Sequence, residues 1–427
     1  MKRPTKGDRL AILIPGLGAV ATTLMAGVMA ARRGLARPVG SLTQMGQLKL
    51  ARATMPVHRA LDLVDLDDLV FGGWDITDHN GLESALEAGA VDDADLEPVA
   101  EELSAVEPMA AVFDPNFVPT LQGPHQKVGA TKWELAHQLV KDIDAFMTRH
   151  QCQRGVGLWC GSTEVQVALD DVHLSLQAFE EGLRQNHPAI SPTMIYAWAH
   201  LRAGLPFING APNRALDCPA LIELAHRQHL PIAGKDFKTG QTLLKTIIAP
   251  GLKARHLGLA GWYSTNILGN RDGAVLDHPQ AFRTKEESKL SVLDACLDAP
   301  QHPELYGDYD HRVTIDYYPP RGDNKEGWDN IDLYGWMDYP MQLKINFLCR
   351  DSILAAPVAL DLVLLTDLVH RMGEEGIQDW LGFYFKAPQT PAGQAPVHDL
   401  FQQQRQLLEQ LCLYAEGQRR LQTASAE

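Results

Sequence analysis

Two lysines, Lys285 and Lys289, stand four residues apart, a spacing that places both ammonium groups on one face of a helix. An isolated pair of this kind is most simply an exposed charged helix. Here, however, the segment GKDFKTGQT (234–242) adds backbone and hydroxyl donors that suit a phosphate, and NILGNRDG (266–273) and GDNK (322–325) follow it. Clustered ammonium groups stabilise negative charge that develops on oxygen, and neighbouring cations lower one another's pKa, so one lysine could act as a base.

A glycine turn near the N-terminus, Gly16-Leu17-Gly18, follows an apolar run and precedes a helical pattern. In that context the first glycine permits a tight turn, and the second lets the backbone approach a pyrophosphate at the helix N-terminus. The run GLGAVATT (16–23) lacks the third glycine of the usual fingerprint, so Thr22 and Thr23 could supply hydroxyls to the phosphates instead. A purely structural turn would use the same glycines, and the pattern alone leaves both interpretations open.

Polar residues follow three other expected strands: Asp75, the pair Ser162-Thr163, and Asp236. Ligands of open α/β sheets bind beyond the carboxyl ends of the strands, which is where these residues fall. Each one alone is equally a turn residue or a helix cap. Their shared placement favours a nucleotide site at this edge of the sheet.

The elements that must position these residues alternate in the first half of the chain, as in a parallel sheet with crossover helices. We expect strands at Leu10–Ile14, Leu69–Phe71, Val156–Cys160 and Leu230–Ala233, and helices at Lys132–Arg149, from Ser191-Pro192 to Gly204, and from Cys218-Pro219 to His229.

After about Gly240 the sequence becomes denser in Gly, Asn, Asp and Lys, with strand-like stretches at Arg312–Tyr318 and Met341–Phe347, which suits a second, antiparallel α+β domain. A long apolar helix from Ala355 could then pack back onto the first domain. The predicted fold is therefore α/β, with a Rossmann-like domain (1–240 and 356–427) interrupted by an α+β domain (241–355).

Composition narrows the class of protein. The net charge of -15 argues against a nucleic-acid partner but is compatible with a small phosphorylated substrate, since a few lysines can make a local positive pocket. Six cysteines lie far apart without a Cys-x-x-Cys pair, which favours a reducing cytoplasm, and the sixteen histidines show no metal-ligand spacing.

The uncharged segment 10–31 has the length of a membrane span. Pro15, Gly16 and Gly18 would break a membrane helix, so we expect a buried strand followed by a packed helix and no membrane partner.

Taken together, these stretches resemble the myo-inositol-1-phosphate synthase family. Motifs similar to those of the family run in order along nearly the whole chain: GLGAVATT, GSLTQ, FGGWDI, PFINGAP, GKDFKTGQT, NILGNRDG, FRTKEESK, GDNK, CRDSILAAP and FKAP. The resemblance implies an NAD cofactor, glucose 6-phosphate as substrate, and a Rossmann-like domain interrupted by a catalytic domain that also forms a cytoplasmic homotetramer.

The resemblance also implies roles for individual residues. It implies catalytic roles for Lys285, Lys289, Lys325, Lys386 and Asp351. It implies substrate binding, including phosphate contacts in the first four positions, for Thr239, Gly240, Gln241, Thr242, Asn266, Leu268 and Asn270. It implies cofactor binding for Gly16, Gly18, Ala19, Val20, Thr22, Thr23, Asp75, Ser162, Thr163, Asp236 and Asp272.

In the implied reaction, C5 of glucose 6-phosphate is oxidised by NAD, a proton leaves C6, the enolate attacks the C1 aldehyde, and the hydride returns to C5. We expect Lys285 to transfer the proton at the C5 hydroxyl, with Lys289, Lys325 and Lys386 as oxyanion and phosphate partners. The substrate phosphate could itself assist at C6, which the sequence leaves open.

The chain departs from many relatives at Lys235 and Thr239, where they have GDDFKSGQT, and at Ile267 and Arg271, where they have NHLGNND. The glycine loop is also shorter, which resembles a bacterial branch and leaves open whether a divalent or monovalent cation assists. Two alternatives remain: an NAD(P) dehydrogenase that releases reduced cofactor, and a sugar-phosphate sensor without catalysis. The first would not need several lysines around a phosphate loop, and the second would be expected to have lost some of them.

Overall fold

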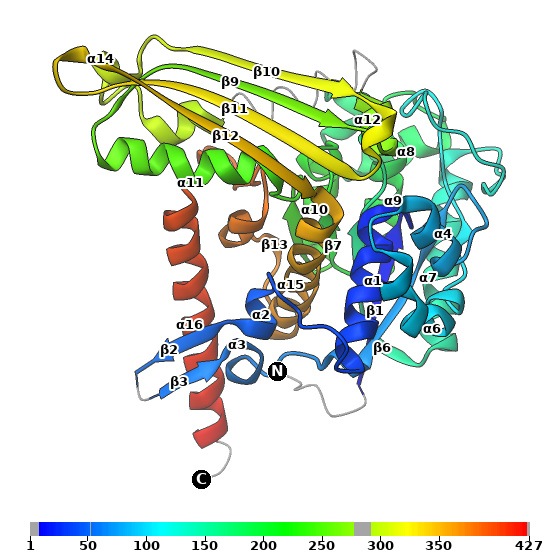
Figure 1. Cartoon of the computed structure of the whole chain (residues 1–427). Helices are drawn as coiled ribbons and strands as arrows, with labels where there is room; N and C mark the ends of the chain where they lie inside the picture. Colours follow the sequence, from blue (N-terminus) through cyan, green and yellow to red (C-terminus); the bar gives the residue numbers. More distant parts are fainter. Residues whose placement is uncertain (1–7, 52, 277–291, 425–427) are drawn as a thin grey trace.

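A computed structural model describes residues 8–51, 53–276 and 292–424 of the chain. Its larger sheet has seven strands in the order β13-β8-β7-β6-β1-β4-β5, and every neighbouring pair is parallel (Figure 1). From β5 to β8 this is the 3-2-1-4-5-6 order of dinucleotide-binding domains. The strands are β1 (Arg9–Pro15), β4 (Leu69–Asp75), β5 (Met109–Ala110), β6 (Cys152–Trp159), β7 (Phe207–Asn209), β8 (Pro231–Gly234) and β13 (Gly376–Ile377).

The first strand shows why this sheet is buried on both faces. Along β1, Leu10, Ile12 and Ile14 belong to one hydrophobic core, and Ala11 and Leu13 belong to another. Successive side chains of a strand point to opposite faces, so a continuous apolar run supplies both cores. The apolar segment 10–31 is thus a strand and a helix, α1 (Ala19–Arg32), as expected.

The expected end of the second strand at Phe71 is wrong, because β4 continues to Asp75. Gly72 and Gly73 lie inside this strand rather than in a turn. A Cβ at Gly72 would stand 2.2 Å from the Phe146 ring, and one at Gly73 would stand 2.0 Å from the Ile14 carbonyl oxygen. The glycines therefore permit close packing against a helix and a neighbouring strand.

Helices cover both faces of the seven-stranded sheet, and the expected ones are confirmed. The expected helices are α7 (Lys132–Arg149), α9 (Pro192–Arg202) and α10 (Pro219–Arg227) on one face, with α1 and α15 (Asp351–Met372) on the other. Helix α8 (Leu176–Arg184), which the sequence did not predict, joins the first face, and α15 begins four residues before the expected start at Ala355. The Ser191 hydroxyl accepts a hydrogen bond from the Met194 amide at the start of α9, and Gly204 adopts φ +76° after its end.

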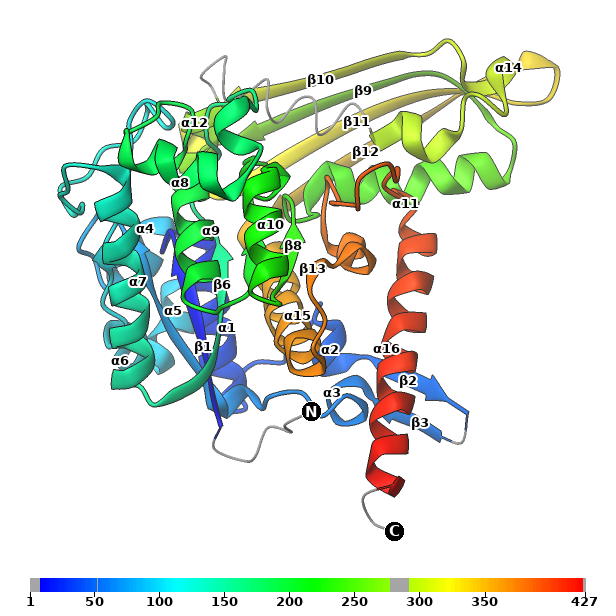
Figure 2. The same ribbon diagram turned by 180° about the vertical axis from the view of Figure 1, so that it is seen from behind.

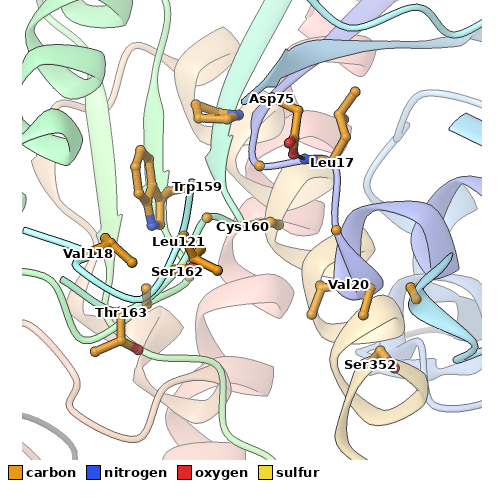
Figure 3. Close-up of a pocket in the computed structure, with 18 of the residues that line it drawn as sticks. Leu17, Val20, Asp75, Val118, Leu121, Trp159, Cys160, Ser162, Thr163 and Ser352 are labelled. Atoms are coloured by element: carbon orange, nitrogen blue, oxygen red, sulfur yellow. Dashed lines mark hydrogen bonds between the residues drawn. The ribbon is translucent and has the colours of Figure 1, made fainter. Parts of the chain in front are cut away.

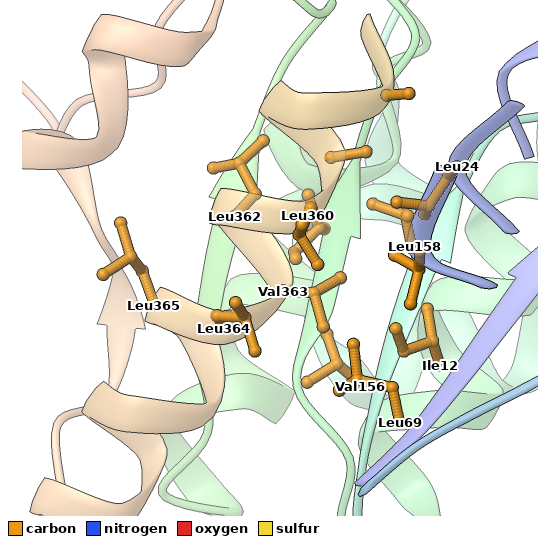
Figure 4. Packing of buried hydrophobic residues seen from close by; sticks show 14 of the residues in the cluster. Ile12, Leu24, Leu69, Val156, Leu158, Leu360, Leu362, Val363, Leu364 and Leu365 are labelled. Atoms are coloured by element: carbon orange, nitrogen blue, oxygen red, sulfur yellow. The ribbon is translucent and has the colours of Figure 1, made fainter. Parts of the chain in front are cut away.

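The long apolar helix α15 packs in the core of the larger sheet. Figure 4 shows Leu360 and Val363 of α15 facing Val156 and Leu158 of β6, all in one hydrophobic cluster. Among the described residues, α15 is the single helix whose length and composition would allow it to cross a membrane. However, 78% of its apolar window is buried inside the protein, as in the core helix of a globular domain.

The second sheet has four strands in the order β10-β9-β11-β12, with bounds β9 (Gly258–Leu268), β10 (Asp310–Tyr317), β11 (Asn324–Tyr334) and β12 (Pro340–Arg350). Helix α11 (Gly240–Ala254) packs on one face, where Ala249 and Leu252 join Leu259, Trp262 and Ile331 in a third core. The expected antiparallel sheet is only partly correct, because β10 and β9 pair in parallel. The long connection between these strands allows the crossover that a parallel pair requires.

The remaining elements fill the space between and beside the sheets. The C-terminal helix α16 (Leu400–Ala424) rises from the hairpin of β2 (Gln47–Leu50) and β3 (Ala53–Pro56) to α11, as both views show (Figures 1 and 2). Shorter helices are α2 (Leu42–Met45), α3 (Val57–Ala60), α4 (Gly81–Ala88), α5 (Asp93–Leu96), α6 (Ala100–Ser104), α12 (Arg271–Leu276), α14 (Pro303–Tyr306) and the 3-10 turn η7 (Asp379–Tyr384).

Candidate active site

A cavity of about 550 Å³ lies beyond the carboxyl ends of the parallel strands and is lined from both sheets. It gathers many of the residues singled out in the sequence: Gly16, Gly18, Ala19, Val20, Asp75, Ser162, Thr163, Asp236, Thr239, Asn270, Asp351 and Lys386. The expectation that the strand-end residues share one site edge therefore agrees with the geometry.

The glycine turn forms one wall of the cavity. Gly16 adopts φ +90°, and a Cβ there would stand 2.5 Å from the Gly161 Cα, so this position requires glycine. Gly18 caps α1 without any side-chain hydrogen bond, no acidic residue lies in the first turn, and a Cβ at Gly18 would meet no atom within 4 Å. Unfilled space beside the free N-terminus of a long helix fits a dinucleotide pyrophosphate.

Asp75 braces this turn. Its carboxylate accepts hydrogen bonds from the Leu17 amide at 2.8 Å and from the Thr77 amide at 3.1 Å. Figure 3 shows Asp75 facing Leu17, with Ser162 and Thr163 on the loop after β6. A carboxylate at the end of the second strand of this fold is also where ribose hydroxyls are usually held.

Thr22 and Thr23 do not line the cavity. The Thr22 hydroxyl donates to the Gly18 carbonyl oxygen of its own helix at 3.0 Å, and Thr23 is buried at 5% exposure. In the described structure, backbone amides at the start of α1 are therefore better placed for phosphates than these hydroxyls.

A buried acid, Glu164, lines the cavity next to Ser162 and Thr163 and was not predicted from the sequence. Its Oε1 accepts a hydrogen bond from the Thr193 amide at 2.8 Å, in the first turn of α9. Burial raises the pKa of Glu164 to about 7, although hydrogen bonds from Ser191 and Thr193 oppose the shift. An acid directly after the Ser-Thr pair at a strand end was the available signal.

Asp236 and Lys386 form a buried ion pair at the cavity. Lys386 Nζ lies 3.2 Å from Asp236 Oδ1, and both side chains are almost fully buried. The backbones are joined as well, since the Lys386 amide donates to the Asp236 carbonyl oxygen at 2.6 Å and Phe237 pairs with Phe385 in a β-bridge. The loop after β8 and the loop after η7 therefore hold this pair jointly.

A second pair joins the four-stranded sheet to α15. Lys325 Nζ at the start of β11 lies 2.6 Å from Oδ2 of Asp351, the first residue of α15. The N-terminus of α11 adjoins this pair, because a Cβ at Gly240 would stand 3.0 Å from Asp351 Oδ1 and 3.6 Å from Lys325 Nζ. Thr239 caps α11 without a side-chain hydrogen bond, which leaves amide donors for an anion beside a lysine.

Five residues expected at the substrate do not line the cavity: Gly240, Gln241, Thr242, Asn266 and Leu268. Gln241 and Asn266 are hydrogen-bonded to each other, and Gln241 Nε2 also donates to the Trp328 carbonyl oxygen at 3.0 Å. Leu268 is buried at 2% exposure. In the described structure these side chains join α11 to the four-stranded sheet. Thr242 is different, since its hydroxyl is buried and has no hydrogen-bond partner among the described residues.

Comparison with known proteins agrees with this geometry. A sequence model of the family described as Myo-inositol-1-phosphate synthase matches residues 10–412. The chain is 50% identical to inositol-3-phosphate synthase 1 of Bacteroides thetaiotaomicron over 412 residues, covering 96% of each chain. It is 34% identical to an inositol-3-phosphate synthase of Mesembryanthemum crystallinum, covering 96% of this chain and 86% of the plant protein. The chain belongs to the myo-inositol-1-phosphate synthase family.

Solved structures agree with membership of this synthase family. The crystal structure of inositol-3-phosphate synthase from Caenorhabditis elegans matches with a TM-score of 0.90 at 26% identity, covering 97% of this chain and 87% of that chain. A myo-inositol-1-phosphate synthase-related protein from Thermotoga maritima, at 21% identity, has the same fold with a TM-score of 0.74, covering 94% and 98% of the two chains. The family, the α/β fold and the NAD-dependent class of enzyme expected from the sequence are confirmed.

Some residues of the expected synthase site are not among those that the structure describes. Lys285 and Lys289 lie outside the described residues, and the side chain of Asp272 is not described. Within the described ranges, no group of three His, Cys, Asp or Glu side chains could hold a metal ion.

The structure adds a polar link that sequence reasoning missed. Asn270 Nδ2 donates to Asp323 Oδ1 at 2.7 Å, and the Ser352 hydroxyl donates to Asp323 Oδ2 at 2.7 Å. All three residues line the cavity, and burial raises the pKa of Asp323. Asp323 lies within the GDNK motif, so attention to its carboxylate rather than its lysine would have found it.

Proposed function

We propose that this chain converts D-glucose 6-phosphate to 1D-myo-inositol 3-phosphate and returns its NAD in the oxidised form, as a step of inositol and phospholipid synthesis. The observation that carries this proposal is the single cavity in which the glycine turn of α1 and the lysine-bearing segments meet. A dehydrogenase would need the first feature, but it would not need buried lysines from β11 and from the loop after η7.

Bound NAD would supply the acceptor and donor of the C5 hydride, with its pyrophosphate at the start of α1. The residues of the chain supply charge and orientation. Lys386 and Lys325, each held by a carboxylate, would stabilise the oxyanion that develops during enolisation and ring closure. From the family pattern, Lys285 would transfer the proton at the C5 hydroxyl, and Lys289 would assist the oxyanion.

We assign the substrate phosphate to the N-terminus of α11. The Gly240 and Thr242 amides lie in the first turn, Thr239 is the cap, and the Thr242 hydroxyl is buried without a hydrogen-bond partner among the described residues. An anion here would gain the positive end of the helix dipole and the neighbouring Lys325, for which it would compete with the Asp351 carboxylate.

We propose a cytoplasmic homotetramer as the working form, built through the open face of the four-stranded sheet. Tyr263, Trp328 and Leu348 are exposed on its strands at 44%, 44% and 58%, and Trp336 and Tyr339 are exposed at the β11–β12 turn. Aromatic and aliphatic side chains on a sheet face opposite α11 are typical of a covered surface. Six free cysteines suit a reducing compartment.

The proposed domain division follows the two sheets. Residues 1–240 and 356–427 would bind the nucleotide, and residues 241–355 would supply catalytic groups and the tetramer surface. Helix α11 starts at Gly240, and α15, which packs with α1, starts at Asp351, so the described elements change sheets near both boundaries.

The test is an assay of the purified protein with NAD and glucose 6-phosphate. We expect 1D-myo-inositol 3-phosphate to form without net growth of absorbance at 340 nm. Accumulation of reduced cofactor would favour the dehydrogenase, and binding of glucose 6-phosphate without turnover would favour the sensor. Repeating the assay with a chelator and with a panel of divalent and monovalent cations tests whether a cation assists.

A further inference from the structure

A buried lysine lies directly beside the active-site residues without lining their cavity. Lys238 stands between Phe237 and Thr239, is 4% exposed, and donates a hydrogen bond from Nζ to Gln403 Oε1 of α16. The Phe383 ring lies 6.0 Å from the ammonium nitrogen. No carboxylate of the described residues forms an ion pair with Lys238.

This placement is unfavourable for the stability of the fold. Burial without an anionic partner disfavours the ammonium form and lowers the pKa of Lys238 to about 7. A methionine of similar length would fill the same space without burying a charge. The fold therefore carries a destabilising group whose contacts lead to the active site.

The side chain of Gln403 connects Lys238 to the turn that precedes Lys386. While its Oε1 accepts from Lys238, its Nε2 donates to the Gly382 carbonyl oxygen at 3.0 Å, in the turn that precedes Lys386. The Lys238 amide donates to the Tyr384 carbonyl oxygen at 2.8 Å. One side chain of the C-terminal helix thus joins the loop that supplies Asp236 and Thr239 to the loop that supplies Lys386.

We propose that Lys238 and Gln403 are positioning residues for the synthase reaction. Through their contact, α16 fixes the loop that supplies Asp236 and Thr239 relative to the loop that supplies Lys386. This inference rests on the proposed function. Figures 1 and 2 show α16 reaching α11, the helix that begins two residues after Lys238. Neither side chain lines the cavity, so the effect passes through Thr239 and Lys386.

The first test compares neighbouring glutamines of the same helix. Gln403→Leu and Lys238→Met are each expected to lower kcat/KM for glucose 6-phosphate roughly 10- to 100-fold, because a displacement of about 1 Å has effects of that size. NAD affinity is expected to stay within about twofold, since the glycine turn is untouched. Gln404→Leu, at an exposed position, serves as the matched control. The double variant Lys238→Met/Gln403→Leu is expected to be no worse than either single variant, as residues in one contact are not additive.

The second test uses charge rather than deletion. Around Lys238 the titratable groups are His398 and Cys296; burial lowers the pKa of His398 to about 4 and raises that of Cys296 to about 12, with Asp399 and Lys253 acting on Cys296. Lys238 is therefore the group of this cluster that titrates near neutrality. Gln403→Glu sets a carboxylate beside it, which raises the pKa of Lys238. The same change removes the Nε2 donor to the Gly382 carbonyl oxygen, so kcat/KM is also expected to fall at every pH. We expect the alkaline limb of kcat/KM to move to higher pH in Gln403→Glu and to stay in place in Gln404→Glu.

The outcomes separate this inference from the proposed function. A wild-type protein that forms no inositol phosphate would overturn the proposed function itself. If the wild type is active but Gln403→Leu and Gln404→Leu have equal kcat/KM, the positioning role is overturned. Additive losses of kcat/KM from Lys238→Met and Gln403→Leu would overturn it as well. If the deletions do not fold, a folded Gln403→Glu with unchanged kcat/KM and an unshifted pH profile overturns it equally.

Discussion

The two sheets contribute to the site in different ways. The seven-stranded sheet is covered on both faces and offers mainly backbone: a glycine turn, a free helix N-terminus, and Asp75 bracing the turn. The four-stranded sheet is covered by α11 on one face, and it contributes Lys325, whose charge is balanced by Asp351. Lys386 belongs to a loop outside both sheets and is balanced by Asp236.

This difference has a physical basis. A dinucleotide pyrophosphate can be bound by amides whose direction is fixed once a strand, a turn and a helix follow one another. An oxyanion that exists only during the reaction is stabilised by lysine side chains held in fixed positions. Because these side chains are long and flexible, carboxylates from other parts of the chain must hold them. The comparison therefore predicts that changes in the first region act on folding or cofactor affinity, and changes at the lysines act on turnover.

The largest effect is expected for Lys386→Met. Loss of this ammonium should lower the rate of inositol phosphate formation on the order of 10³-fold, because one positioned charge at a developing oxyanion is worth that much. NAD affinity, measured by calorimetry, should change little. The exposed Lys141→Met on α7 is the control. Turnover that survives in Lys386→Met would remove the contrast between the two regions.

The next effect concerns stability and compares the two kinds of sheet face. Leu158 is fully buried in β6, and Leu158→Ala is expected to lower the free energy of unfolding by about 2–5 kcal/mol. Leu348 on the open face of β12 lies opposite Glu326, so Leu348→Lys should leave monomer unfolding within about 0.5 kcal/mol. The same change should reduce the tetramer in sedimentation velocity, because it buries a charge in the interface. A tetramer unaffected by Leu348→Lys would argue against this face as the assembly surface.

A smaller effect should appear in the pH dependence of stability at Glu164. Because burial raises the pKa of Glu164 to about 7, the folded state holds this proton over a range in which the unfolded state has released it. Stability contributed by the protonated acid is complete below the unfolded pKa and is lost as pH rises through about 7. A glutamine side chain at this position cannot titrate, so Glu164→Gln should gain roughly 2 to 3 kcal/mol relative to wild type between about pH 5 and about pH 8. Denaturant titrations at both pH values measure this, and a constant difference would show that Glu164 is already ionised in the fold.

The smallest effect is expected for Gly18→Ala. A Cβ at Gly18 meets no protein atom, so the melting temperature should remain near that of wild type, while the methyl group enters the space assigned to the pyrophosphate. NAD affinity should fall about tenfold, which corresponds to about 1.4 kcal/mol. Gly16→Ala is the contrasting variant, because its Cβ would collide with Gly161 and its φ is positive. Equal NAD affinity in Gly18→Ala and wild type would place the pyrophosphate elsewhere.

The sequence by itself determined the features that depend on a few neighbouring residues. The strand at Leu10–Ile14, the glycine turn, the cap at Ser191 and the polar strand ends all follow from local backbone preferences, and the structure has them where expected. Family motifs along nearly the whole chain determined the enzyme class for the same reason, since each motif is a local pattern.

Only the tertiary structure decided which groups meet. It paired Lys325 with Asp351 and Lys386 with Asp236, and it turned Gln241 and Asn266 toward each other rather than into the cavity. It also made β10 parallel to β9 and buried Glu164 and Lys238. These outcomes depend on the packing of segments far apart in the sequence. Burial and pairing energies are set by whatever surrounds a side chain after folding, which a local pattern does not contain.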